Sequence, residues 1–213
     1  MKVASPMIPT SLSMYSLNDF VSEGSLESAQ VIDQEADKLT IAAADLNGVT
    51  IEKCRLGGAQ LPRLSARDAL LSKSDFSGSI MTQASFNRVI LSDCRMSGLD
   101  FSNAQLHDVV FKGCKLDMVN FRFADLRRVK FVDCQLVEAD FLSGVLHDVT
   151  FESCQLEATV FEKATCKSVD LRTSELINIV GWPSLKGATI DGAQLSMVAP
   201  SLAYALGLTV NNG

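Results

Sequence analysis

Three stretches of the chain read LHDVVFKGCKLDMVNF (106–121), LRRVKFVDCQLVEADF (126–141) and LHDVTFESCQLEATVF (146–161). They align at a spacing of 20 residues, and within each one a large apolar residue returns at every fifth position. This five-residue pattern continues without a break from Ile41 to Leu176. A helix needs an apolar period of 3.6 residues and a flat strand a period of two, so the pattern indicates neither. It favours a short extended piece that turns a corner and starts again.

The residue two places before each large apolar residue is uncharged throughout the repeats, as Val129 is before Phe131. Side chains alternate along an extended chain, so both residues of such a pair point to the same side, which must be the interior. The other three residues of each pentad then face outward. Four pentads make one four-sided coil of 20 residues, and successive coils stack as parallel strands about 4.8 Å apart.

Stacking places equivalent residues of successive coils in columns. One interior column is expected to hold Phe101, Phe121, Phe141 and Phe161, and the opposite one Phe111, Phe131 and Phe151. Leucines fill the two sides between them. About seven coils are expected over residues 41–180, and the register reaches back towards Leu26 and Val31.

At this point the chain resembles the pentapeptide-repeat proteins, whose consensus is Ala-Asp/Asn-Leu-x-x. The motif reads Ala44-Asp45-Leu46, Ser74-Asp75-Phe76, Ala124-Asp125-Leu126 and Ala139-Asp140-Phe141. The resemblance, to the bacterial type, implies an all-β solenoid, a right-handed quadrilateral parallel β-helix of pentapeptide repeats with a short C-terminal helix.

Three segments are expected along the chain. Residues 1–25 form an N-terminal cap, irregular over Pro6–Ser25, because an open β-helix exposes its core at both ends. Residues 26–195 form the β-helix, with a register break at 177–189 and a resumption one residue out of phase at Ile190 and Leu195. Residues 196–213 form a C-terminal capping or dimerisation helix and tail.

The C-terminal candidates are apolar residues at helical spacing, namely Leu195, Val198, Leu202 and Leu206. Two interpretations stay open for them. The helix covers the last coil, or it pairs two chains, since symmetric pairing buries an apolar end and a C-terminal helix commonly pairs chains in related pentapeptide proteins.

The six cysteines are read as structural. Five occupy the small inward position and one the large inward position; they are Cys54, Cys94, Cys114, Cys134 and Cys154, and Cys166. Buried free cysteine behaves as a small hydrophobe, and the pairs two to four residues apart that zinc sites need are missing from the sequence. We therefore expect reduced thiols, no metal, no cofactor and a cytoplasmic location.

No catalytic residue is expected, and the chain is not expected to be an enzyme. The nucleotide-binding glycine motifs and H-E-x-x-H are missing from the sequence. The two histidines, His107 and His147, are expected to face water, two coils apart. Between them, Arg128 is expected to join Asp108 and Asp148 in a ladder of opposite charges.

Several outward positions are apolar and give a candidate contact surface. Phe123 and Leu142 are expected on neighbouring coils of one face. The full candidate set is Phe123, Leu142, Val137, Arg127, Arg128, His107 and His147.

Two functions follow from this pattern. The first is a non-enzymatic protein-interaction scaffold whose partner is unidentified. The alternative is a DNA mimic that binds DNA gyrase, as some pentapeptide-repeat proteins do. The net charge is −6, but residues 53–133 carry more bases than acids, which weakens the mimic. Overall acidity argues against direct nucleic-acid binding. The sequence has no run of 18 apolar residues, so no membrane span is expected. Its first 20 residues lack a charged segment followed by an unbroken apolar stretch, so no signal peptide is expected.

Overall fold

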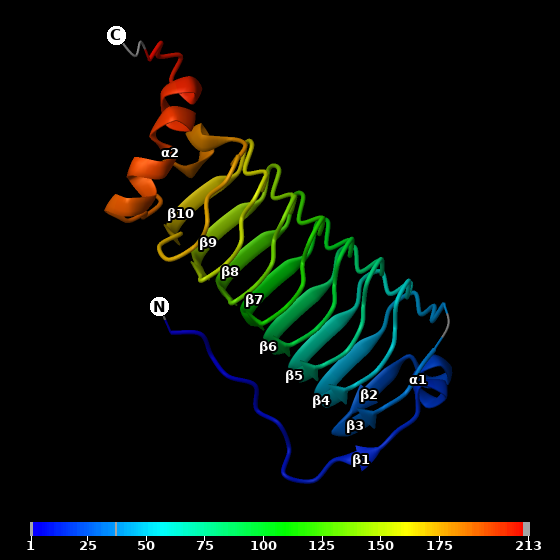
Figure 1. Ribbon diagram of the computed structural model, residues 1–213. Helices are drawn as coiled ribbons and strands as arrows, with labels where there is room; N and C mark the ends of the chain where they lie inside the picture. Colours follow the sequence, from blue (N-terminus) through cyan, green and yellow to red (C-terminus); the bar gives the residue numbers. More distant parts are fainter. Residues whose placement is uncertain (1, 37, 211–213) are drawn as a thin grey trace.

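The computed structural model describes residues 2–36 and 38–210. It is a parallel β-solenoid of about 8 turns with a short C-terminal helix, which confirms the predicted fold class. Figure 1 shows the coils stacked along one axis, with the C-terminal helix at one end and a short helix at the other. One chain segment, in dark blue, leaves the first coil and runs along the outside of the stack.

The strands form one sheet in which hydrogen-bonded neighbours run parallel. Their bounds are β1 (Ser13–Met14), β2 (Ser25–Glu27), β3 (Ala29–Ile32), β4 (Asp45–Glu52), β5 (Ser65–Ser72), β6 (Ser85–Ser92), β7 (Gln105–Lys112), β8 (Asp125–Val132), β9 (Val145–Glu152) and β10 (Thr165–Asp170). Residues 20 apart are partners, so Phe131 pairs with Phe111 on one side and with Phe151 on the other. The 20-residue period is therefore one full coil.

The corners of the coil explain the period of five. Counted from the large inward residue, the third residue of each pentad from Gly48 to Asn178 lies in the left-handed region of the backbone, with φ of 58° at Phe123, 52° at Arg128 and 53° at Asp133. This conformation costs residues other than glycine roughly 1–2 kcal/mol each. The hydrogen bonds and core contacts of the neighbouring coils must offset that cost at every corner.

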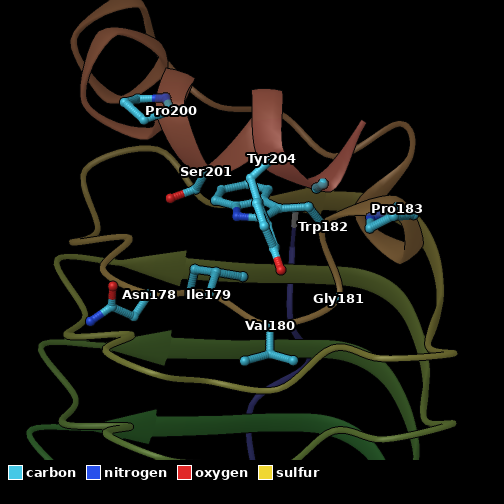
Figure 2. Close-up of a pocket in the computed structure, with 10 residues that line it drawn as sticks. Asn178, Ile179, Val180, Gly181, Trp182, Pro183, Pro200, Ser201 and Tyr204 are labelled. Atoms are coloured by element: carbon cyan, nitrogen blue, oxygen red, sulfur yellow. The ribbon is translucent and has the colours of Figure 1, made fainter. Parts of the chain in front are cut away.

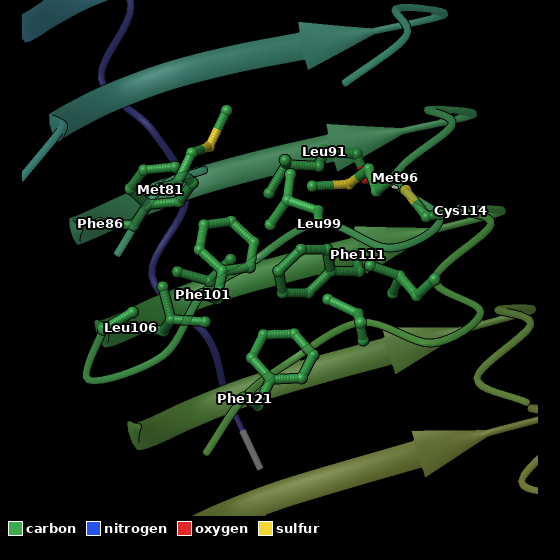
Figure 3. Packing of buried hydrophobic residues seen from close by; sticks show 14 of the residues in the cluster. Met81, Phe86, Leu91, Met96, Leu99, Phe101, Leu106, Phe111, Cys114 and Phe121 are labelled. Atoms are coloured by element: carbon green, nitrogen blue, oxygen red, sulfur yellow. Dashed lines mark hydrogen bonds between the residues drawn. The ribbon is translucent and has the colours of Figure 1, made fainter. Parts of the chain in front are cut away.

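The interior is filled by the predicted columns of phenylalanine. The rings of Phe111 and Phe131 stack with centroids 4.9 Å apart and planes 6° from parallel. Across the interior, Phe131 meets Phe141 edge to face at 6.3 Å and 83°. Figure 3 shows this interior at Phe101 and Phe121, from the same side of successive coils, and at Phe111, from the opposite side. Both arrangements are favoured for aromatic pairs, so the two columns support each other.

The cysteines lie where the five-residue period places them. Five are buried, and Cys166 is half-buried. The Cys134 thiol donates to the carbonyl oxygens of Val132, at 3.3 Å, and Phe111, at 3.5 Å. Burial raises the pKa of the Cys166 thiol to about 11. Such a shift lowers the thiolate fraction at neutral pH and with it the reactivity of the thiol.

The N-terminal end is closed by α1 (Leu17–Glu23), which is more regular than the irregular cap expected over Pro6–Ser25. Ser16 and Asp19 form a capping box, and Gly24 ends the helix in the left-handed conformation. Leu17 and Phe20 are buried against the first coil. The sequence signal was present, since Ser16 precedes an acidic residue by three positions.

Residues 2–12 do not belong to this end cap. They are the segment that runs along the outside of the stack in Figure 1, and we call them the N-terminal strap. Of the cap expected over 1–25, only α1 covers the end of the solenoid. The strap instead lies along the side of the coils. Met1 is outside the described residues.

The C-terminal end departs from the predicted boundaries. Parallel pairing continues to Val180, so the register breaks later than Ile177. The chain turns away at Gly181, whose φ is 88°. Only glycine fits there, because a Cβ would lie 2.5 Å from the nitrogen of Glu162. The 3-10 helix η1 (Trp182–Leu185) follows, and pairing resumes one residue out of phase at Thr189.

The last element is α2 (Gly192–Ala205), which begins four residues before the predicted boundary at 196. Leu195 therefore lies in the helix and is 50% exposed, so its assignment to a resumed pentad was wrong. The buried Gln194 amide donates to the carbonyl oxygens of Leu171 and Ser174, both at 2.7 Å. These bonds satisfy backbone groups that the open end of the solenoid would leave unpaired.

We expect Phe131→Ala to lower the free energy of unfolding by about 3–5 kcal/mol, because it leaves a cavity in both ring columns. The matched control is Phe123→Ala, whose side chain is 57% exposed and should cost at most about 0.5 kcal/mol. Urea unfolding followed by circular dichroism measures both. Equal stability of the two variants would contradict the assigned interior.

Candidate functional site

The N-terminal strap crosses the outer face of β4–β7 and makes directed contacts with it. The backbone N–H of Met7 donates to Oδ1 of Asp68 at 2.9 Å, and that of Ala4 donates to Oδ1 of Asp108 at 3.1 Å. The Pro9 ring lies over Gly48, where a Cβ would be 3.0 Å from it. Gly48, Asp68 and Asp108 occupy the same position of the 20-residue coil, so the strap follows one column.

Each of the two carboxylates is held in place by an arginine of the next coil. Arg88 bonds to both oxygens of Asp68 at 2.7 and 2.6 Å. Arg128 bonds to both oxygens of Asp108 at 2.8 and 2.7 Å. These hydrogen bonds hold the pKa of each carboxyl below its usual range, with a smaller contribution from the strap N–H groups. The two bidentate pairs fix the acceptor oxygens beneath the strap.

The predicted ladder of Asp108, Arg128 and Asp148 is therefore incomplete. Arg128 turns to Asp108, and within the described residues the ion-pair contact of Asp148 is with His147, at 3.7 Å. The histidines are half-buried, against the expectation that they face water, and Nε2 of His107 is buried without a hydrogen-bond partner in residues 2–36 and 38–210. Next to His107, the strap lies against this face, since the N–H of Ala4 donates to Asp108.

A second column on the same strands is basic. Its residues, in order from β4 to β10, are Asn47, Arg67, Asn87, His107, Arg127, His147 and Lys167. None of them is acidic, and Arg67, Arg127 and Lys167 are exposed. Arg127 is partly neutralised by Asp125, to which it bonds at 2.8 and 3.0 Å. This basic column brings together three of the candidate contact residues, His107, Arg127 and His147.

The apolar candidates separate into two corners. Phe123 and Leu142 meet as predicted, since the N–H of Phe123 donates to the carbonyl of Leu142 at 3.0 Å. Val137 instead pairs with Met118, whose N–H donates to its carbonyl at 2.8 Å. Phe123 and Met118 are 57% and 59% exposed. Phe123 and Leu142 thus form one apolar corner, and the candidate set as a whole does not form one site.

The C-terminal end carries a third feature, a groove of 570 Å³ between the last coil and α2. Figure 2 shows Tyr204 of α2 and Trp182 of η1 among the residues that line it, with Ile179 and Val180 on the solenoid side. Of the predicted helix residues, Val198 is buried and Leu202 packs on the core. Leu195 and Leu206 are exposed, together with Met197 and Tyr204.

Two general properties of the described residues complete the picture. Within them, His, Cys, Asp and Glu side chains do not gather in groups of three that could hold a metal ion. Neither α1 nor α2 is long and apolar enough to cross a membrane.

The strap and its contacts with Gly48, Asp68 and Asp108 were missed by sequence reasoning. The strap contributes two backbone donors, which leave no mark on residue type, and its side chains follow no period. One signal was available at Gly48, Asp68, Arg88, Asp108, Arg128 and Asp148, which alternate in charge at 20-residue intervals after a glycine. That signal predicts the ion pairs but not what covers them.

The Asp68–Arg88 and Asp108–Arg128 pairs should stabilise the folded protein at neutral pH and lose this effect in acid. Both carboxyls have lowered pKa values in the folded state, so their contribution is present above the unfolded value of about 3.9 and disappears as pH falls through the folded value. The melting temperature of Asp68→Asn/Asp108→Asn should lie below that of the parent at pH 7, and the difference should shrink below about pH 4. Asp148→Asn is the matched control, with little effect at pH 7. A difference that grows on acidification would contradict the assignment.

Comparisons with solved structures find similar chains at low sequence identity. QnrB1, a plasmid-mediated fluoroquinolone resistance protein solved in a trypsin-treated variant form, is 20% identical, with 88% of this chain and 90% of that chain covered and a TM-score of 0.48. HetL, a pentapeptide repeat protein involved in heterocyst differentiation regulation in the cyanobacterium Nostoc sp. strain PCC 7120, is 16% identical, with 78% and 89% covered and a TM-score of 0.36. No curated protein sequence gives a significant match.

A family model described as the pentapeptide repeat region matches residues 44–121, 64–141 and 104–179. These overlapping matches cover more than half of the chain and coincide with the coils from β4 to β10. The chain therefore belongs to the pentapeptide repeat family.

Proposed function

We propose that the chain is a non-enzymatic scaffold that binds a protein partner through its outer faces. The observation that carries this proposal is the division of the repeat. The inward positions of every pentad are used for the core, and the outward positions build columns with distinct character on a stiff frame. Columns at a fixed spacing suit recognition of another protein surface by complementary charge and shape.

The apolar corner at Phe123 and Leu142 is the part of this surface that we assign to the partner. Exposed aromatic residues with a polar surround are typical of interface centres. Phe123 is exposed by 57%, and Arg122 beside it is paired with Asp140 at 2.6 Å, which leaves a defined polar rim. Arg127, Arg128, His107 and His147 lie on the neighbouring strands β7–β9.

The scaffold proposal is tested by affinity capture from a lysate of the native host. Phe123→Glu should lose a protein that the parent chain captures, because a charge replaces the apolar contact. Asn103→Glu is the matched control, since Asn103 is exposed at the same position of the preceding coil. Recovery of the same proteins by all three chains would contradict the assignment of this corner.

The alternative function, a DNA mimic that binds gyrase, finds little support in the surface. A mimic needs an uninterrupted acidic potential along the rod, since phosphate charge dominates DNA binding. The basic column with exposed Arg67, Arg127 and Lys167 interrupts any such stripe on the face of β4–β10.

We therefore expect the purified protein neither to inhibit gyrase supercoiling nor to protect gyrase from a quinolone. The assay is a titration of the protein into a supercoiling reaction with and without the drug. Inhibition or protection at sub-micromolar protein would replace the scaffold proposal with the mimic.

We further propose that two chains pair through the C-terminal segment. The support is the apolar exposure of Met197 (73%), Tyr204 (87%) and Leu206 (72%) beside the groove at Trp182. Apolar side chains gathered at one end of a molecule mark an interaction site, and pairing about a two-fold axis would cover both copies at once.

Sedimentation equilibrium at about 50 μM should then give a dimer for the parent chain. Met197→Asp/Tyr204→Asp should be monomeric, because a charge would be buried in the interface. Val21→Asp, at the exposed face of α1 on the opposite end, should remain dimeric. A monomeric parent chain would rule out the pairing.

We also propose that the protein lies in the cytoplasm. The support is that its five buried cysteines are free thiols, which suits a reducing compartment.

A further inference from the structure

The N-terminal strap is bound to the solenoid as a separate peptide would be. In residues 2–12, two hydrogen bonds reach the coils, and both use backbone N–H groups, those of Ala4 and Met7. No strap residue is part of the buried core within the described chain. Val3, Pro6 and Ile8 are half-buried, while Met7 is 68% exposed. Ordering this segment costs chain entropy at every residue, and few contacts offset it.

The spacing of the contacts matches an extended chain to the coil repeat. Asp68 and Asp108 are two coils apart, which is about 10 Å at the strand spacing of a sheet. Met7 and Ala4 are three residues apart, which is also about 10 Å in an extended chain. Two successive acceptors of the column therefore meet two donors of one peptide without bending it.

The column is built to receive this kind of ligand. Asp68 and Asp108 are 6% and 8% exposed, and each keeps one oxygen shared between an arginine and a strap N–H. At the third contact, Gly48 presents no side chain, and Pro9, which has no N–H to satisfy, lies against it. Recognition by backbone N–H groups accepts many side chains, as in other modes of binding to extended peptides.

The column also extends past the contacts of the strap. On β8 and β9 it continues with Arg128 and Asp148, whose side chains are 44% and 38% exposed, whereas those of Arg88 and Asp68 are 25% and 8% exposed. A longer peptide could engage this open part first and then replace the strap from Asp108 towards Gly48.

We propose that the outer face of β4–β7 is a binding track for an extended peptide of a partner protein. The strap occupies this track as an intramolecular ligand that the partner peptide must displace. The identity of the partner rests on the proposed scaffold function, but the track can be tested with the chain's own peptide, so the two proposals fail separately.

The test uses the full chain and a synthetic peptide of residues 2–12 carrying fluorescein at its C-terminus, followed by fluorescence anisotropy. Ala4→Pro/Met7→Pro removes both donors of the strap and should release it. This variant should bind the peptide at least about tenfold more tightly than the parent chain, in which the track is occupied. Thr10→Pro is the matched control, because the Thr10 N–H makes no hydrogen bond in the described chain, and it should behave as the parent.

Two further measurements assign the binding to the column. In the Ala4→Pro/Met7→Pro background, Asp68→Ala/Asp108→Ala should weaken binding about tenfold or more, while Asp148→Ala should change it less than about twofold. Without altering the protein, methylation of the peptide nitrogens of Ala4 and Met7 should abolish binding, and methylation of those of Ser5 and Ile8 should not. Equal binding to all chains, no binding to any chain, or binding that survives loss of both donors would overturn the proposal.

Discussion

The parallel backbone pairing of residues 20 apart is the constraint on which the whole molecule depends. Gln135 N–H donates to the Cys114 carbonyl and Gln155 N–H to the Cys134 carbonyl, both at 3.0 Å, and the same bond recurs from coil to coil. The pairing holds only while each coil has the same number of residues. It offsets the energetic cost of the left-handed corners, at residues such as Arg128 and Glu138, which a single coil could not maintain. Each coil is thus stable because of its neighbours, as in other solenoids.

The same constraint shapes the surface. Because every coil repeats its predecessor, an outward residue is always followed by its equivalent one strand spacing further along, and charges become columns. Asp68 and Asp108 fall in one column, while Arg67 and Arg127 fall in the next. An extended peptide advances about 10 Å over three residues, and the column advances about as far over two coils. The N-terminal strap can therefore reach the carboxylates of Asp68 and Asp108, which lie two coils apart. The ends escape this rule, and there Gln194 and the capping box at Ser16 satisfy the backbone locally.

The interior could be predicted from the sequence because burial leaves a periodic trace. Phe111, Phe131 and Phe151 lie in the column that their spacing indicates. The corners could not be recognised from residue type. Their left-handed conformation is usually marked by glycine, but here Phe123 and Glu138 adopt it. Leu195 was counted both as a resumed pentad and as a helix residue, because helical and pentad spacings overlap over a few residues, and only its place in the helix is right. The strap left no trace at all, since it binds through backbone donors, and the surface candidates separated because outward side chains are not held to one side by a core.

Deletion of one whole coil tests the central claim most directly. Removing residues 141–160 joins Asp140 to Phe161 in the same register and keeps the column contacts at Asp68 and Asp108. Removing residues 141–158 takes out fewer residues but shifts every later pentad by two positions. The large inward residues, such as Phe161, then fall at the outward left-handed corners, and the interior loses them. Thermal unfolding followed by circular dichroism should show a cooperative transition for the first variant, and a clearly lower or absent transition for the second. Equal or greater stability of the 141–158 deletion would contradict the account.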